Sequence, residues 1–476
     1  MAAGKGRPTS GLSISPQSAG TRGKSNLTMD VEAIQLSDYG RASSRPSPVN
    51  RMMAAFAADF RDQVDVNLGV GYVNESTIPR RLIEESLRAV LAEPGKYRVA
   101  LNYGGPTGSA NLIESIRRFH LEHQVGGLTD EVLSQCEIII GPNGATSLLD
   151  GLAQVLAPGI VVTTDPIYYI YCHALQRMGF ELCAVPEDAD GLDTDRLETK
   201  LLELGERRSE VRLFYIVTIN NPTCSILSNC RRRRLVEIAA RLSRGLGRKV
   251  PVVFDKAYEN LVHDPAVEKP ASGLLYDELG IVYEVGTLSK ILAPALRVGY
   301  LIGPGGPLVR ALVQKTSDAG FSAPLVTQEM ASYLLDHHVA GQIERVNAGY
   351  REKAVRTRAW IEEHLGRELA ECRGGSAGFY FYLTFARIET HERSPFFRFL
   401  SRTTGREAID GPAGNKRARV VYIPGEFCVH PGGQMVAQGR RQLRLSYAFE
   451  ELPRIEQAVR LMGEAAAYAA QQQPIR

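Results

Sequence analysis

One lysine, Lys290, has neighbours that are either apolar or suited to a phosphate. Residues 288–296 around it are mostly leucine, isoleucine, alanine and proline. A desolvated lysine has a lowered pKa, so its free amine can attack a carbonyl. The hydroxyls of Thr287 and Ser289 and the guanidinium of Arg297 are donors that a phosphate would accept. A carbonyl compound that carries a phosphate and accepts a lysine is, most simply, pyridoxal 5′-phosphate. The stretch alone leaves open a buried turn whose lysine reaches water.

Four further stretches carry polar residues directly after apolar runs, where ligands of parallel sheets bind. They are Gly-Pro-Asn-Gly-Ala-Thr at 141–146, Asp-Pro-Ile-Tyr-Tyr at 165–169, Asn-Asn-Pro-Thr at 220–223 and Asp-Lys-Ala-Tyr at 255–258. The first suits a phosphate at a helix N-terminus, and the second offers an aromatic ring for stacking. An asparagine amide suits a phenolic oxygen, and a strand-end aspartate suits a protonated pyridine nitrogen. Each has an ordinary structural alternative, such as a turn or a core tyrosine. Their occurrence in series with Lys290 favours one shared site.

The elements that must position these residues alternate regularly along the chain. Apolar runs occur at 136–140, 160–164, 182–185, 213–218, 250–254, 281–285 and 300–303. Helical patterns occur at 47–60, 79–92, 110–119, 145–156, 170–178, 194–204 and 232–242. This alternation predicts an α/β fold in which helices cover a mainly parallel sheet.

A second, smaller α+β domain is predicted after one long connecting helix over 324–366. Its strands are expected at 378–383, 420–423 and 442–447, and a closing helix at 451–467. We divide the 476 residues into four parts. These are a disordered tail over 1–45, an N-terminal arm with part of the small domain over 46–94, the large cofactor-binding domain over 95–330, and the connecting helix with the small domain over 331–476.

Composition narrows the classes of protein. The net charge of +3 favours neither a nucleic-acid binder nor an acidic tail. Seven scattered cysteines indicate reduced thiols in a cytoplasmic protein, and the nine histidines show no metal-ligand spacing. The longest apolar runs are too short for a membrane span. The arginine- and serine-rich start leaves a transit peptide open. The four arginines at 231–234 predict a solvated first helical turn, with a functional patch as the alternative.

Seven stretches resemble motifs of the fold-type-I, class I and II aminotransferases that use pyridoxal 5′-phosphate, both in their residues and in their order along the chain. They lie at 103–108, 141–146, 165–168, 221–223, 255–258, 289–300 and 443–446. Residues 44–49 and 67–71 resemble the aminoadipate and kynurenine aminotransferase branch. Two positions depart from the pattern. Cys224 replaces a usual glycine, which puts the loop backbone in question, and Asn50 replaces an arginine of the branch, which puts a preference for a second carboxylate in question.

The resemblance implies roles for cofactor-binding residues. Lys290 would form the internal aldimine, Asp255 would pair with the pyridine nitrogen, and Asn221 and Tyr258 would hold the phenolic oxygen. Tyr168 would stack on the ring. The phosphate would be held by Gly144, Ala145, Thr287, Ser289 and Arg297.

The resemblance also implies a homodimer, because Tyr103 would reach the phosphate of a partner subunit. Arg444 would clamp the substrate α-carboxylate, with Asn221 and Gly71 lining the same pocket. Lys290, Asp255 and Tyr258 would then be the catalytic residues.

The expected reaction is ping-pong transamination between an L-amino acid and a 2-oxo acid. A β-eliminating lyase, a racemase and an aminocyclopropane-type cyclase would use the same residues. A ligand-sensing regulator is a further alternative, but residues 1–45 are short and poor in apolar residues for a winged-helix module. No nucleic-acid, membrane or metal partner is expected.

Overall fold

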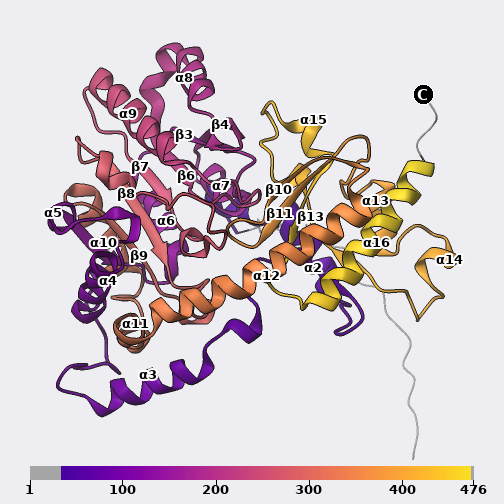
Figure 1. The fold of residues 1–476 in the computed structure, drawn as a ribbon. Coiled ribbons are helices and arrows are strands. Elements are labelled where there is room, and N and C mark those ends of the chain that lie inside the picture. The colour runs from indigo at the N-terminus through magenta and orange to yellow at the C-terminus, as the bar shows by residue number, and fades with distance from the viewer. Residues whose placement is uncertain (1–33, 473–476) are drawn as a thin grey trace, which may run out of the picture.

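The structure, a computed structural model, describes residues 34–472 and is built around an eight-stranded sheet (Figure 1). The strand order is β2-β9-β8-β7-β6-β3-β4-β5. The strands are β2 (Cys136–Ile140), β3 (Ile160–Asp165), β4 (Glu181–Asp188), β5 (Gly191–Leu192), β6 (Val211–Val217), β7 (Val252–Asp255), β8 (Val282–Thr287) and β9 (Gly299–Pro304). Strands β8, β7, β6, β3 and β4 are parallel to their neighbours in that series, whereas β9 is antiparallel to both β2 and β8. The predicted α/β class and mainly parallel sheet are confirmed.

Helices cover both faces of this sheet because both faces of its strands are apolar. On one face, α6 (Gly144–Val155), α7 (Tyr169–Arg177) and α10 (Pro307–Gly320) share a core with strand residues such as Val161 and Leu213. On the other, α4 (Ala110–Glu122), α5 (Asp130–Ser134), α8 (Thr194–Glu203) and α9 (Asn229–Leu246) share a core with residues such as Val162 and Phe214. The carboxyl ends of the parallel strands remain for the polar residues that follow them.

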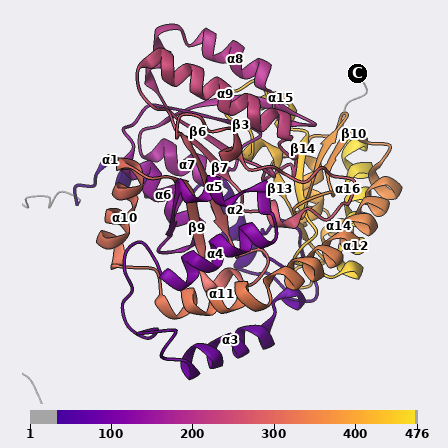
Figure 2. The ribbon, with the colours of Figure 1, turned by 60° about the vertical axis from the view of Figure 1, so that its left-hand side comes forward.

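The prediction of a single helix over 324–366 is wrong. Two helices, α11 (Leu325–His337) and α12 (Val339–Leu365), are separated by His338, whose φ of −137° lies outside the helical region. The break allows the chain to serve two layers, because α11 packs on α4 and on α3 (Arg80–Ala92), while α12 packs on the C-terminal helix α16 (Leu452–Gln471). Figure 1 shows α12 running from the large sheet to the small one, and Figure 2 shows α3 on the outer side of α11.

The small domain has an antiparallel sheet in the order β10-β11-β14-β13, as expected of an α+β unit. Its strands are β10 (Leu369–Gly374), β11 (Tyr380–Phe385), β13 (Ile423–Pro424) and β14 (Gln442–Ser446). Its helices, besides α12 and α16, are α13 (Pro395–Ser401), α14 (Glu407–Asp410) and α15 (Val436–Gly439). The strand predicted over 420–423 is divided, because β12 (Val420–Val421) leaves this sheet to pair with β1 (Val66–Asn67).

The N-terminal part is only partly described, since residues 1–33 lie outside the described range. Within the predicted tail over 1–45, α1 (Asp38–Ser43) forms a helix, which corrects that prediction for these residues. The Ser37 hydroxyl caps it by accepting the Gly40 amide at 3.0 Å. The next helix, α2 (Pro48–Ala57), packs against the small domain. Within 34–472, no helix is long and apolar enough to cross a membrane.

The four arginines at 231–234 do not form one solvated turn. Arg232 is fully buried and its guanidinium bonds both carboxylate oxygens of Glu259, at 3.2 and 3.0 Å. Arg231 pairs with Asp188, and Arg234 pairs with Glu198. The prediction is therefore wrong for Arg232, whose side chain faces the loop that follows β7, whereas Arg233 in the same turn is exposed.

Candidate active site

Lys290 lies in the turn after β8, where its amine faces the segment that follows β1. Its Nζ donates to the Gly71 carbonyl at 2.9 Å and lies 5.5 Å from the ring centroids of Tyr258 and Phe379. Burial, and then the positive charges of Arg444 and Arg297, lower the pKa of the ammonium to about 8. A substantial fraction of the amine is therefore neutral and nucleophilic at mildly alkaline pH.

Asp255 ends β7 with its carboxylate buried. Oδ2 accepts from the Tyr215 hydroxyl at 2.8 Å, and Oδ1 accepts from the Ala257 amide at 3.0 Å. Both donors are neutral, and within residues 34–472 the carboxylate forms no ion pair. Burial raises the pKa of Asp255. A buried carboxylate of this kind favours a cationic partner within hydrogen-bond distance.

Arg444 projects from β14 and is buried between the two domains. Its Nη1 donates to Asn221 Oδ1 at 2.8 Å, and its Nη2 donates to the Gly69 carbonyl. The Nε of the same guanidinium is buried without a partner among the described residues. Gly71 thus contacts Lys290, and Arg444 contacts Asn221 and Gly69, two residues before Gly71; the substrate-binding roles of Asn221, Gly71 and Arg444 stay predictions. The group has a cation fork suited to a carboxylate.

Tyr258 meets a residue that the sequence analysis did not identify. Its hydroxyl lies 2.9 Å from that of Tyr380, on β11, and the two rings meet edge to face at 5.7 Å. The ring centroid of Tyr380 lies 4.3 Å from the Arg444 guanidinium carbon. The available signal was the alternation of aromatic residues along 378–383, but nothing in that pattern points to Tyr258, 122 positions away.

The residues expected to hold the phosphate lie where α6 begins. The Arg297 Nε donates to Asn143 Oδ1 at 2.7 Å and its Nη2 donates to the Asn143 carbonyl at 3.0 Å. Gly144 has a φ of +68°, and a Cβ there would lie 2.9 Å from the Arg297 guanidinium. No side chain caps α6, so the amides of its first turn, which includes Ala145, have no side-chain acceptor. An anion is the natural partner of such a helix start with an arginine beside it.

Thr287 and Ser289 lie at the end of β8 in the same loop. The Thr287 hydroxyl donates to the Val298 carbonyl at 2.8 Å, accepts from the Ser289 amide at 3.1 Å, and lies 3.0 Å from the Ser289 hydroxyl. Both side chains are buried beside Lys290. Tyr168 precedes α7 and packs against the core of the large domain. Burial, and then the charge of Asp255, raise the pKa of the Tyr168 phenol.

Tyr103 is not brought to this cluster. Its side chain is 76% exposed and packs against Phe321, 62% exposed, with ring centroids 5.6 Å apart. Among the described residues, no hydrogen bond or ring contact links it to Lys290 or its neighbours. The contribution of Tyr103 to a partner subunit stays a prediction.

The structure describes the surroundings of Cys224 and Asn50, the two residues that depart from the family pattern. Cys224 is buried with a φ of +53°, the left-handed conformation that glycine adopts most easily, so the turn holds a strained non-glycine residue. Arg51, beside Asn50, points to the small domain and pairs with Glu392 at 3.1 Å. In the structure Arg51 is therefore engaged outside the Lys290 cluster.

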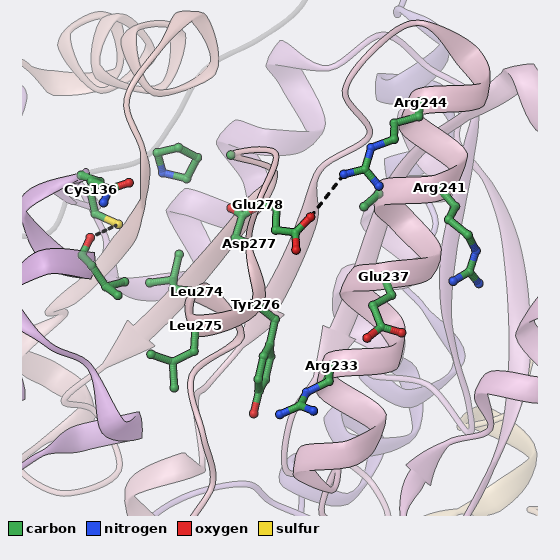
Figure 3. A pocket seen from close by; sticks show the side chains of 15 residues that line it. Cys136, Arg233, Glu237, Arg241, Arg244, Leu274, Leu275, Tyr276, Asp277 and Glu278 are labelled. Atoms are coloured by element: carbon green, nitrogen blue, oxygen red, sulfur yellow. Dashed lines mark hydrogen bonds and ion pairs between the residues drawn. The ribbon is translucent and has the colours of Figure 1, made fainter.

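A separate cavity of about 690 Å³ lies between α9, β2 and the turn before β8 (Figure 3). Figure 3 shows Arg244 bonded to Glu278, while Arg233 lies 5.0 Å from the Tyr276 ring centroid. The lining residues Asp277, Glu278 and Gly280 lie at the amino end of β8, whereas Lys290 follows its carboxyl end. Arginines and carboxylates occur in equal number in its lining, so its charge is balanced.

The clustered residues fit pyridoxal 5′-phosphate. Asp255 is a buried carboxylate whose two hydrogen-bond donors in the described residues are both neutral. Such a carboxylate is a suitable partner for a protonated ring nitrogen. The uncapped start of α6 and Arg297 suit the phosphate, and the Lys290 amine suits the aldehyde. Among the described residues, no group of three or more His, Cys, Asp or Glu could hold a metal ion.

Comparisons with known proteins agree with the geometry. Residues 64–398 match the family model "Aminotransferase class I and II". The 2-aminoadipate transaminase of Thermus thermophilus is 28% identical over 393 residues, covering 81% of this chain and 86% of that protein. The crystal structure of Pyrococcus horikoshii kynurenine aminotransferase, in complex with PMP, superposes with a TM-score of 0.75 at 22% identity, covering 90% of this chain and 96% of that one. The resemblance to the aminoadipate and kynurenine branch is confirmed.

A relative of another kind is also similar. The uncharacterized HTH-type transcriptional regulator YisV of Bacillus subtilis is 23% identical over 435 residues, covering 91% of this chain and 80% of that protein. Proteins named as enzymes and a protein named as a regulator are thus both similar to this sequence.

Proposed function

The chain belongs to the class I and II aminotransferases, and from this premise we propose that it transfers the amino group of an L-amino acid to a 2-oxo acid. Members of this family bind pyridoxal 5′-phosphate. The observation that carries the proposal is that Lys290, Asp255 and Arg444, from two domains, lie close enough for the charges of Arg444 and Asp255 to act on the Lys290 amine. Amino-acid chemistry on this cofactor requires three groups: a cation for the substrate carboxylate, a nucleophilic amine for the aldehyde, and a buried anion for the ring nitrogen. Arg444, Lys290 and Asp255 would supply them in that order.

The proposed cofactor contacts follow from the described side chains. Asp255 would keep the ring nitrogen protonated, Asn221 and Tyr258 would hold the phenolic oxygen, and Tyr168 would stack on the ring. Phosphate contacts would come from Gly144, Ala145, Thr287, Ser289 and Arg297. Tyr103 would complete the site of the second subunit in a homodimer.

When bound, the cofactor supplies an aldehyde and an electron-accepting ring for the amino acid. Arg444 holds the α-carboxylate and thereby orients the Cα–H bond. The Lys290 amine, whose pKa is lowered to about 8, is the base that takes the proton from Cα. The same amine delivers this proton to the carbon that was the aldehyde carbon of the cofactor. Burial of these groups excludes water, which strengthens each electrostatic contact.

The visible absorption spectrum tests the proposal. Purified protein with cofactor is expected to show a yellow band that one amino acid, added alone, bleaches with release of its 2-oxo acid. Lys290→Ala should lack this half-reaction. Parallel lines in initial-rate plots are expected for the two-substrate reaction. Absence of any band with added cofactor would contradict the proposal.

Two other outcomes identify alternatives on the same residues. Ammonia or a cyclised product, formed while the yellow band persists, would indicate a lyase or a cyclase. A band that amino acids alter without release of any product would favour ligand sensing, the function that the similarity to YisV suggests.

A further inference from the structure

Tyr380 touches three of the candidate residues although it belongs to none of the motifs that define the site. It begins β11, is fully buried, and shares a strand face with Tyr382, which pairs directly with Arg444 of β14. We propose that Tyr380 is a positioning residue with two contacts. Its hydroxyl orients the hydroxyl of Tyr258, and its ring orients the guanidinium of Arg444. The inference rests on the proposed transamination.

The hydroxyl contact concerns Tyr258. The two phenol oxygens lie 2.9 Å apart, and within residues 34–472 neither has another hydrogen-bond partner. A phenol carries one proton and can also accept, so Tyr258 can accept from Tyr380 while it donates to a third group. Accepting one bond polarises a hydroxyl and strengthens the bond that it donates. Tyr380 therefore makes Tyr258 a better donor to an anionic ring oxygen.

The ring contact concerns Arg444. The guanidinium carbon lies 4.3 Å from the Tyr380 ring centroid, while Asn221 Oδ1 holds Nη1 at the guanidinium edge. A guanidinium held by a ring on its face and an amide at its edge has a fixed plane. The fork is thereby presented to a carboxylate in one orientation.

The Tyr380 hydroxyl also adjoins the segment that contacts Lys290. A Cβ at Gly71 would lie 2.6 Å from the hydroxyl oxygen, and the Gly71 carbonyl accepts the Lys290 amine at 2.9 Å. One side chain thus meets the proposed carboxylate clamp, the proposed phenolic-oxygen donor and the backbone in contact with the lysine.

The experiment compares holoprotein variants by the pH midpoint of the visible band. A bond donated to the anionic ring oxygen lowers the proton affinity of the nearby lysine-derived nitrogen, so weakening that bond raises the midpoint. Tyr380→Phe is expected to raise it by about 0.5 pH unit. Tyr382→Phe is the matched control. It removes a hydroxyl two positions along the same strand face, one that donates to Gln442 at 3.1 Å, and should leave the midpoint unchanged.

A double variant and a second probe separate the two contacts. Tyr258→Phe should also raise the midpoint, and adding Tyr380→Phe to it should give no further rise, because both act through one hydroxyl. Propionate, a carboxylate without an amine, probes Arg444 through its effect on the band. Its half-saturating concentration should stay within about twofold in Tyr380→Phe and rise about tenfold in Tyr380→Leu, which loses the ring.

The outcomes distinguish this inference from the proposed function. Equal midpoints in wild type, Tyr380→Phe and Tyr382→Phe, with Tyr258→Phe shifted, would overturn the role of Tyr380 alone. A wild-type protein that forms no band would overturn both. Cofactor-free melting temperatures of Tyr380→Phe and Tyr382→Phe should be similar, since each loses one buried hydroxyl bond.

Discussion

Replacing Arg444 should weaken amino-acid binding more than any other change at the site. A carboxylate held by two charge-assisted hydrogen bonds gains about 1.5–3 kcal/mol from each. Arg444→Lys keeps the charge but loses the fork, so it should cost about 1.5–3 kcal/mol, or about 10- to 150-fold in KM. Arg444→Ala removes both bonds and should cost about 3–6 kcal/mol. The apparent KM for the donor amino acid, from initial rates at saturating 2-oxo acid, measures both.

The structure also predicts the effect of these changes on folding. Arg444→Ala leaves Asn221 Oδ1 and the Gly69 carbonyl without the donors that they have in the structure. Each loss should cost about 1–3 kcal/mol of unfolding free energy, so assays belong well below the melting temperature of the variant. Arg440→Ala is the control, because Arg440 forms an exposed pair with Glu389 at 3.0 Å, worth about 0–1 kcal/mol.

A folded Arg444→Lys or Arg444→Ala protein with the KM of wild type would refute the reasoning. The substrate carboxylate would then bind elsewhere, and the buried arginine would have only a structural role. A change in KM equal to that of Arg440→Ala would have the same meaning.

Three further predictions concern other groups. Borohydride-trapped labelling of Lys290 by pyridoxal 5′-phosphate, followed by mass spectrometry, should quicken about tenfold per pH unit below pH 8 and level off above it, because its pKa is lowered to about 8; a flat profile would contradict this. Gly71→Ala places a Cβ 2.6 Å from the Tyr380 hydroxyl and should cost about 1–3 kcal/mol in urea unfolding, whereas Gly341→Ala, with nothing within 4 Å, should not destabilise the protein. Burial opposes ionisation of Asp65, but bonds from two guanidinium groups hold its pKa well below the usual range. Its contribution is therefore present above about pH 4 and lost as pH falls below that value, so the cost of Asp65→Asn, about 3–5 kcal/mol at pH 7, should shrink in acid; a constant cost would argue against the ion pair.

The sequence could predict the parallel strands and the residues that follow them, because buried strands are short apolar runs and functional residues of parallel sheets follow their carboxyl ends. Asp255, Asn221 and Lys290 were singled out in this way, and in the structure each lies at or after the carboxyl end of one of three neighbouring parallel strands, β7, β6 and β8. The helix α10 was missed although Pro307 at its start and the apolar Val309 mark it.

Contacts between the domains could not be predicted from spacing. The bond between Tyr258 and Tyr380 depends on how β11 sits against the large domain, and Arg297 depends on Asn143 in a turn 154 positions earlier. The break at His338 was also hidden, because neither glycine nor proline occupies that position and the apolar pattern continues across it. Tertiary packing, rather than local preference, ends α11 there.

The backbone after β1 behaves as a tethered competitor. Its Gly71 carbonyl accepts a hydrogen bond from the Lys290 amine, which must turn to attack an aldehyde, and its Gly69 carbonyl accepts from the Arg444 guanidinium, which a carboxylate would also engage. Because the segment is part of the chain, its effective concentration is high and dilution cannot remove it. Every affinity measured at this site is therefore net of displacing two carbonyls. Loosening the segment is consequently a route to tighter ligand binding that adds no contact to the pocket.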